Sequence, residues 1–255
     1  MTYEPVIALS AKWYSYPERF DWIKDNGFAL EYSPNPESPE ELDLHITPFL
    51  EAGIPVRYHA FFQGYEIGHR DKSVCERAMQ VHKAALQAMR GRGEQVMTVH
   101  IGLNPEDEIV SDRAAGNLTQ LVKYAGNLDI TICLENLRRG PTSDPEVLVS
   151  WAKQAGAMIT LDIGHALGCR RVKDGELSIL DFFDMVSDRL REAHVYERET
   201  DRHYPPQDMS VLGPIVDRLL GSKCSWWTIE LDDFDEALST RKLLQDYIHS
   251  RKERR

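Results

Sequence analysis

Residues 130–136 read ITICLEN and residues 159–165 read ITLDIGH, and these two stretches decide the fold class. Each contains a short, nearly continuous run of β-branched and aliphatic residues that closes on a carboxylate, Glu135 in the first and Asp162 in the second. Uninterrupted apolar runs of this length are typical of strands covered on both faces, as the strands of a parallel sheet are. The two carboxylates would then lie at the ends of buried strands.

The same kind of run recurs along the whole chain. The runs are VIALS (6–10), ALEYS (29–33), VRYHA (56–60), VMTVHIG (96–102), ITICLEN (130–136), ITLDIGH (159–165), EAHVY (192–196) and WWTIELD (226–232). Amphipathic, helix-like patterns follow them at 17–26, 38–52, 71–89, 111–125, 143–155, 178–190, 210–220 and 234–248. Eight strands that each precede one helix predict an α/β fold, a (β/α)8 TIM barrel with a single domain over residues 1–255. The alternative, an open doubly wound sheet, would carry a Gly-rich loop after its first strand, and none is found there.

The charge and the cysteines narrow the function classes. The chain has 30 basic and 41 acidic side chains and a formal net charge of −11, so its overall field repels polyanions such as DNA. Its four cysteines show no CxxC spacing, which favours reduced thiols over disulfides or a zinc ribbon. No stretch approaches the roughly 20 apolar residues of a membrane span, and the N-terminus shows no signal-peptide pattern. We therefore expect a cytoplasmic protein without a membrane partner.

Metal-ligand residue types gather at the ends of the predicted strands. In a TIM barrel the carboxyl ends of the strands carry the chemistry. These ends and the loop RETDRHY (198–204) carry nine candidate ligands: His59, His100, Glu135, Asp162, His165, His194, Asp201, His203 and Glu230. Imidazole and carboxylate ligands suit zinc, manganese or iron. A structural hydrogen-bond network is the alternative, but ligand types at six consecutive strand ends favour a metal centre.

In this order the motifs resemble those of the xylose-isomerase-like TIM-barrel superfamily. The resemblance rests on His59, VHIG (99–102), LEN (134–136), LDIGH (161–165), His194, DRH (201–203) and IELD (229–232). The superfamily contains sugar isomerases and epimerases together with endonuclease IV, of the AP endonuclease family 2. The resemblance spans residues 56–232, most of the predicted barrel, and implies a barrel that binds divalent metal ions.

The two branches of the superfamily imply different metal sites. The endonuclease IV pattern implies three ions: the first on His59, His100 and Glu135, the second on Glu135, Asp162, His194 and Glu230, and the third on His165, Asp201 and His203. The epimerase pattern implies one ion on Glu135, Asp162, His194 and Glu230. In that second pattern Glu135 and Glu230 also act as acid and base.

These residues favour a metal-dependent phosphoesterase. An epimerase would leave His59, His100, Asp201 and His203 idle, whereas hydrolysis of a phosphodiester can use several ions to activate water and clamp the phosphate oxygens. The expected catalytic residues are Glu135, Asp162 and Glu230. We expect up to three ions per chain, of zinc, or else manganese, iron or cobalt. A sugar or sugar-phosphate isomerase or epimerase is the alternative, and a non-catalytic barrel is the third hypothesis.

Other features bear on the substrate. The basic stretches 138–139 and 170–173 follow predicted strands, so they either flank the barrel mouth or are solvated loop charges. Phe61, Phe62 and Tyr65 either stack on a flat group of the substrate or close the mouth. Ile101 stands where endonuclease IV usually has proline, and residues 204–208 replace its glycine pair. Together with the acidic charge, these departures favour a small phosphate ester or sugar over nucleic acid as the partner.

Overall fold

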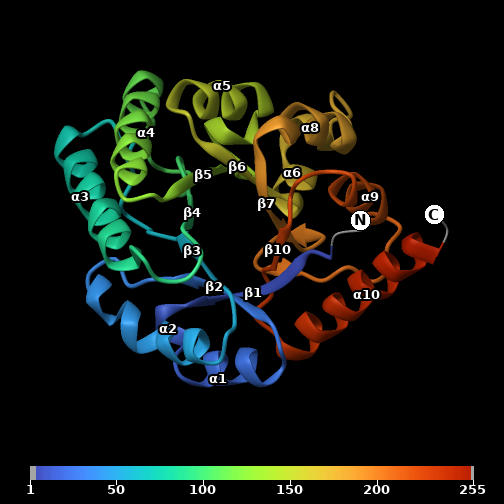
Figure 1. Ribbon diagram of the computed structural model, residues 1–255. Helices are drawn as coiled ribbons and strands as arrows, with labels where there is room; N and C mark the ends of the chain where they lie inside the picture. The colour runs from blue at the N-terminus through green and yellow to red at the C-terminus, as the bar shows by residue number, and fades with distance from the viewer. Residues whose placement is uncertain (1–3, 254–255) are drawn as a thin grey trace.

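Eight parallel strands close into a barrel in the order β1-β10-β7-β6-β5-β4-β3-β2 (Figure 1). The computed structural model describes residues 4–253. The barrel strands are β1 (Val6–Lys12), β2 (Ala29–Ser33), β3 (Val56–Ala60), β4 (Val96–Val99), β5 (Thr131–Glu135), β6 (Met158–Asp162), β7 (Leu190–Val195) and β10 (Trp226–Ile229). The predicted (β/α)8 TIM barrel is confirmed, and each predicted strand overlaps an observed one.

Helices surround the barrel and cover its outer face (Figure 1). The long outer helices are α1 (Glu18–Asp25), α2 (Leu42–Glu51), α3 (Lys72–Met89), α4 (Ser111–Gly126), α5 (Pro145–Ala155), α8 (Ile179–Val186), α9 (Gly213–Leu220) and α10 (Phe234–Glu253). Short additional elements follow β6 and β7: α6 (Ile163–Gly168), α7 (Arg170–Lys173) and an antiparallel hairpin of β8 (Arg198–Glu199) and β9 (His203–Tyr204). Within residues 4–253, none of the helices has the length and apolar composition needed to cross a bilayer.

Three of the helices that begin later than predicted follow a polar capping residue: Asp71 before α3, Asp144 before α5 and Ser178 before α8. The pattern predicted a helix from residue 143, but α5 begins at Pro145, and the Asp144 carboxylate accepts a hydrogen bond of 2.9 Å from the Glu146 N–H. Ser178 likewise lies outside α8 and forms a capping box with Asp181. Capping side chains take up N–H groups that have no partner inside the helix. A capping residue therefore looks helical in the sequence although it precedes the helix.

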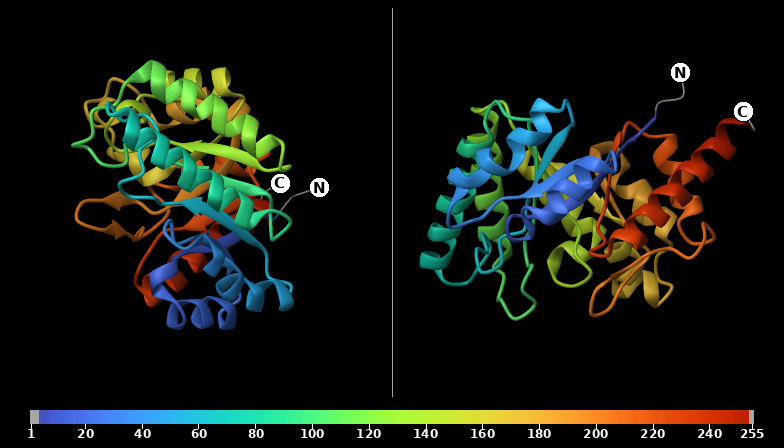
Figure 2. Two further views of the ribbon diagram at one scale, coloured as in Figure 1. Left: turned by 90° about the vertical axis from the view of Figure 1, so that its left-hand side faces the viewer. Right: turned by 90° about the horizontal axis from the view of Figure 1, so that it is seen from below.

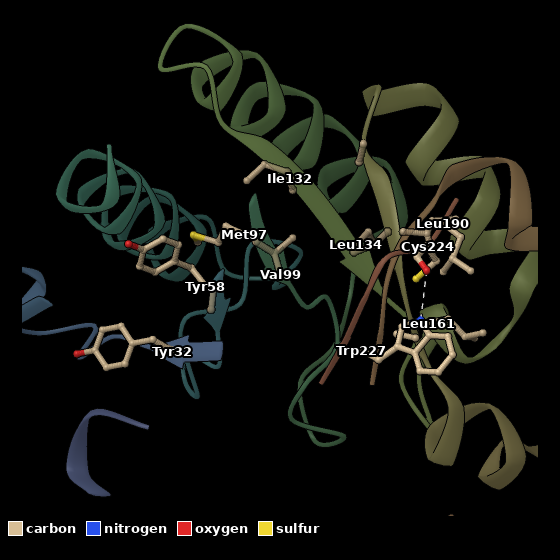
Figure 3. Packing of buried hydrophobic residues seen from close by; sticks show 14 of the residues in the cluster. Tyr32, Tyr58, Met97, Val99, Ile132, Leu134, Leu161, Leu190, Cys224 and Trp227 are labelled. Atoms are coloured by element: carbon tan, nitrogen blue, oxygen red, sulfur yellow. Dashed lines mark hydrogen bonds between the residues drawn. The ribbon is translucent and has the colours of Figure 1, made fainter. Parts of the chain in front are cut away.

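Apolar side chains of the strands pack into one large core. Leu134 on β5, Leu161 on β6 and Trp227 on β10 are buried, and the Trp227 indole N–H donates a hydrogen bond of 3.2 Å to the Cys224 carbonyl (Figure 3). The four cysteines are free and buried, as the absence of CxxC spacing indicated. Burial of strand side chains under the ring of helices is the main source of the barrel's stability.

Polar side chains also fill part of the barrel interior. Arg57 on β3 lies 3.4 Å from the Glu192 carboxylate on β7, and the Thr228 hydroxyl on β10 donates a hydrogen bond of 3.1 Å to the same carboxylate. Strands β3 and β7 are not neighbours in the barrel, so this contact crosses its interior. The Arg57 guanidinium also lies 4.5 Å from the ring centroid of Trp226. The interior therefore holds buried charge in addition to apolar packing.

We expect Leu134→Ala to lower the free energy of unfolding by about 2–5 kcal/mol, because Leu134 is fully buried and truncation leaves a cavity in the core. Urea denaturation followed by circular dichroism measures the change. Leu44→Ala is the matched control, since Leu44 on α2 is 60% exposed and its truncation should alter stability by less than about 0.5 kcal/mol. Equal effects of the two substitutions would contradict the packing described here.

Candidate metal centre

The candidate ligands meet at the carboxyl end of the barrel. Glu135 and Asp162 are the last residues of β5 and β6, His194 is the penultimate residue of β7, and His100 and Glu230 directly follow β4 and β10. Parallel strands end on the same side of a barrel, so these side chains share one mouth. In both views of Figure 2 the β8–β9 hairpin projects from the end of the barrel that lies away from the two termini.

Potential ligand atoms form four groups, each with its nitrogen and oxygen atoms within 4.8 Å of one another. They are the His100 group (His59, His100 and Glu135), the Asp162 group (Glu135, Asp162 and His165), the hairpin group (His165, Glu199 and His203) and the Glu31 group (Glu31, His59, His194 and Glu230). His59, Glu135 and His165 each belong to two groups. The four groups therefore form one continuous cluster.

The His100 group brings together three residues that were predicted as ligands of one ion. The Nε2 atoms of His59 and His100 lie 3.1 Å apart, and they lie 3.3 and 3.1 Å from the same oxygen, Oε2 of Glu135. All three side chains are buried. Two imidazoles and a carboxylate that converge in this way match the ligand types and spacing of a small divalent cation site.

Asp162, in the Asp162 group, is held in place by several hydrogen bonds. Its Oδ1 accepts from the His165 N–H at 2.6 Å, which caps α6, and its Oδ2 accepts from the Tyr196 hydroxyl at 3.0 Å. The Asn136 side chain exchanges two hydrogen bonds of 2.8 Å with the Asp162 backbone. His165 Nδ1 lies 3.3 Å from Asp162 Oδ2. The carboxylate is thus oriented before any ligand binds.

The hairpin group lies where the β8–β9 hairpin folds over α6. His165 Nε2 lies 3.3 Å from Glu199 Oε2, and the His203 ring stacks on Tyr196 with centroids 3.8 Å apart and an interplanar angle of 5°. His203 Nδ1 lies 2.8 Å from the Glu230 carbonyl oxygen, so this nitrogen donates a hydrogen bond. The Nε2 atom of His203 therefore keeps its lone pair for a ligand.

Asp201 lies outside the four groups. Its exposed carboxylate lines the cavity at the barrel mouth, and its Oδ1 accepts hydrogen bonds of 2.6 and 2.9 Å from the Thr200 and Tyr204 hydroxyls. Glu199, which the sequence analysis did not single out, is the carboxylate of the hairpin group. A role for Asp201 as a ligand stays a prediction.

Glu31 is a second carboxylate that the sequence analysis missed. It is the middle residue of β2 and is fully buried, and its Oε1 lies 3.1 Å from Nε2 of His194 on β7. The predicted ligands lie at strand ends or in the loop 198–204, and Glu31 lies at neither. The available signal was a carboxylate inside the otherwise largely apolar run ALEYS, since buried charges are rare unless they are paired.

Burial and mutual charge set the protonation of the cluster. Burial acts to lower the pKa of His59, but the Glu31 and Glu135 carboxylates outweigh burial and raise that pKa to about 10. Burial raises the pKa of the Asp162 carboxyl to about 6, although the neighbouring His165 opposes this rise. The carboxylates therefore favour positive charge among them, on the imidazoles or on a cation.

Unpaired atoms in the cluster fit a metal ion. Among the described residues, Glu31 Oε2, Glu135 Oε2 and His194 Nδ1 are buried polar atoms without a hydrogen-bond partner. Such atoms are rare in folded proteins, because each costs about 1–3 kcal/mol when left unsatisfied. Imidazole nitrogen and carboxylate oxygen are ligands of zinc and of the neighbouring transition metals. The residues present are therefore suited to hold divalent ions.

A cavity of about 390 Å³ opens over the cluster. Its lining includes His59, His100, Glu135, His165, His203 and Glu230. Four basic residues also line it: Lys12, Arg138, Arg139 and Arg202. Arg138 Nε lies 3.0 Å from the Glu199 carboxylate, whereas within residues 4–253 neither Lys12 nor Arg139 has a carboxylate oxygen within 4.0 Å. The cavity thus combines an acidic and imidazole-rich site with free positive charge.

Only some of the aromatic and basic residues that were considered for substrate binding line the cavity. Phe62 is buried and packs edge-on against His82, with ring centroids 5.0 Å apart, so it closes the core and cannot stack on a ligand. Phe61 lines the cavity, and the Lys12 ammonium lies 4.2 Å from the centroid of its ring. Of the two basic stretches only 138–139 lines the cavity, whereas Arg171 on α7 pairs with Glu146.

We expect Gly164→Ala to destabilise the protein and to loosen the Asp162 group. A Cβ at Gly164 would lie 2.0 Å from Cε2 of the buried Tyr196 ring, so that ring must move and release Asp162. Overpacking of this kind costs about 1–3 kcal/mol or more, measurable by urea denaturation, with near-UV circular dichroism reporting on the tyrosine. Gly116→Ala on α4 is the control, since its Cβ meets nothing within 4 Å. If Gly164→Ala were as stable as the control, the contact would be refuted.

Comparison with known proteins agrees with the motifs. The model of the xylose isomerase-like TIM barrel family matches residues 20–247. An uncharacterized protein of Methanocaldococcus jannaschii is 36% identical over 158 residues, which cover 62% of this chain and 68% of that protein.

Two solved structures share the fold at low sequence identity. A D-tagatose 3-epimerase-like protein has a TM-score of 0.76 and 17% identity, with 97% of this chain and 98% of that one covered. Endonuclease IV from Thermus thermophilus has a TM-score of 0.74 and 16% identity, with 96% and 100% covered. These likenesses show the fold alone, which an epimerase-like protein and a nuclease have in common. From the family match, the chain belongs to the xylose isomerase-like TIM barrel family.

Proposed function

We propose that this protein is a metal-dependent phosphoesterase that hydrolyses a small phosphodiester at the mouth of the barrel. The observation that carries the proposal is the sharing of ligands between groups. Glu135 belongs to the His100 group and to the Asp162 group, and His165 belongs to the Asp162 group and to the hairpin group. Adjacent ions that share ligands can act together on one phosphate. A site for a single ion would leave the His100 group and the hairpin group without a purpose.

The His100, Asp162 and hairpin groups, together with His194 and Glu230, would hold divalent ions, of which zinc, manganese, iron and cobalt suit their nitrogen and oxygen atoms. When bound, such ions lower the pKa of a coordinated water and offset the negative charge of phosphate oxygens. Glu135 and Glu230 line the cavity, where either carboxylate can accept a proton from an attacking water. Asp162, fixed by Tyr196 and by the start of α6, holds its neighbour His165 in orientation.

The cavity favours a small anionic substrate. Its volume of about 390 Å³ suits a small molecule. Lys12 and Arg139 reach into it without a carboxylate partner in the described chain, so their charges are available to bind phosphate oxygens. The net charge of −11 opposes the approach of a long polyanion such as duplex DNA. A phosphodiester with two small ester groups is small enough for the cavity and carries a negative charge that Lys12 and Arg139 can bind.

A sugar epimerase is the second candidate function. One observation favours it: Glu135 Oε2 and Glu230 Oε1 lie 3.4 and 3.5 Å from the same atom, Nδ1 of His194. Two carboxylates that flank one position suit an acid and a base that act on opposite sides of a sugar carbon. A D-tagatose 3-epimerase-like protein has the same fold, and one fold can carry more than one kind of chemistry.

We expect His100→Ala to lower the rate of hydrolysis of bis(4-nitrophenyl) phosphate by about 100-fold, because it removes a ligand of an ion that would stabilise charge on the phosphate. Mass spectrometry of metal-loaded protein should show fewer ions per chain. The control is His82→Ala, which truncates another buried imidazole that belongs to none of the four groups. One ion per wild-type chain, with turnover of a ketose and none of the phosphodiester, would instead establish the epimerase.

The double substitution Asp201→Ala and His203→Ala should remove one ion per chain and slow phosphodiester hydrolysis, while it spares the ions at the His100 and Asp162 groups. The reason is that His203 belongs to the hairpin group alone. Metal content and rate are measured on the same preparations. A parallel Glu199→Gln variant tests whether Glu199 supplies the carboxylate of the hairpin group. Unchanged metal content in the double variant would contradict a third ion there.

A further inference from the structure

His194 has two differently occupied ring nitrogens. Its Nε2 lies 3.1 Å from Glu31 Oε1 and is hydrogen-bonded to it, whereas its Nδ1 is buried and has no hydrogen-bond partner among the described residues. The unpartnered Nδ1 lies 3.4 Å from Glu135 and 3.5 Å from Glu230. The imidazole is fully buried, so water cannot take the place of either partner.

The chemistry of the two partners assigns the proton. An ionised carboxylate can only accept a hydrogen bond, so the hydrogen between Glu31 and His194 must be carried by Nε2. When a metal ion binds the imidazole, one nitrogen donates its lone pair and the other keeps its hydrogen. The hydrogen bond to Glu31 therefore leaves Nδ1 as the ligand atom, and Nδ1 is the atom that faces Glu135 and Glu230.

Within residues 4–253, the ion pairs of Glu31 are with histidine side chains. Arg57, the register partner of Glu31 on β3, pairs with Glu192 at 3.4 Å and with Glu94 at 3.6 Å. In the described part of the chain the ionic contacts of Glu31 are with His194 at 3.1 Å and with His59 at 4.0 Å. Glu31 and His194 come from β2 and β7, which are not adjacent.

We propose that Glu31 is a positioning residue that holds His194 with its hydrogen on Nε2 and presents Nδ1 to a metal ion beside Glu135 and Glu230. The proposal rests on the metal centre of the proposed function, but it does not depend on which reaction follows, since His194 and Glu230 belong to the ion site in both candidate enzymes. A carboxylate behind a ligating histidine fixes its orientation and makes the other nitrogen a stronger donor.

The first test determines which ring nitrogen of His194 carries the hydrogen. Long-range 1H–15N correlation spectra of the zinc-loaded, 15N-labelled protein resolve the two ring nitrogens, and the loss of a signal in His194→Gln assigns them. We expect the hydrogen on Nε2 and the zinc on Nδ1. Zinc on Nε2 would overturn the proposal and leave the proposed phosphoesterase intact. A wild-type chain that binds none of zinc, manganese, iron and cobalt would overturn both.

The second test compares two buried carboxylates. Glu31→Gln should weaken zinc binding at His194 by about 10- to 100-fold, the usual effect of removing such a partner, as measured by following the His194 ring signal during a zinc titration. Glu66→Gln is the matched control, because Glu66 is also a buried carboxylate but belongs to none of the four groups.

The pair of variants separates positioning from general stability. Glu66→Gln should lower the thermal stability, because it weakens the hydrogen bonds that Glu66 accepts from the Gly68 and Gly102 N–H groups, and should leave zinc affinity at His194 unchanged. Equal losses of affinity in the two variants would show that Glu31 acts only through stability and would overturn the proposal. A third outcome is that the wild-type protein binds zinc but does not hydrolyse a phosphodiester, and that Glu31→Gln binds zinc more weakly. This outcome would support the role of Glu31 and refute only the hydrolase.

Discussion

The burial of several carboxylates beside several imidazoles is the constraint on which this molecule depends. Glu31, Glu135, Asp162 and Glu230 are all buried, three of them at the carboxyl ends of strands and Glu31 in the middle of β2. Carboxylates in a medium of low polarity repel one another and lose their hydration, so they need positive charge close by. The histidines supply it in part, and the unpaired atoms of the cluster are suited to a divalent ion. The hydrogen bonds and stacked rings around the cluster serve to keep these groups together.

The barrel can meet this constraint because its strands bring distant residues to one mouth. His59 on β3 and His194 on β7 are 135 positions apart in the chain, yet their ring centroids lie 5.1 Å from each other. Both are carried by strands whose hydrogen-bonded ladders restrict backbone motion. A site built on strand ends is positioned more tightly than one built on loops. The hairpin, which adds Glu199 and His203, is the part of the cluster that depends on loop structure.

The family shows why the fold alone does not decide the reaction. The same barrel is found in an epimerase-like protein and in a nuclease, and function has to be argued from the residues at its mouth. Here a central set of carboxylates and His194 suits either chemistry. Our proposal of a phosphate ester rests on the surrounding histidines and on Lys12 and Arg139, which line the cavity and have no carboxylate partner within residues 4–253. The proposed positioning of His194 by Glu31 would serve a phosphoesterase and an epimerase alike.

The apolar pattern of the sequence is enough to predict the barrel, its eight strands and helices, and the strand-end positions of most of the cluster. The reason is that buried parallel strands have a continuous apolar pattern, and the residues that carry the chemistry follow at their carboxyl ends. It did not determine the role of Glu31, since that role comes from a contact across the barrel with a strand far away in the chain. Nor did it separate Glu199 from Asp201, because the turn of the hairpin decides which carboxylate faces His165. Spacing along a strand is a local property, whereas contact between strands that are not neighbours exists only after the barrel has closed.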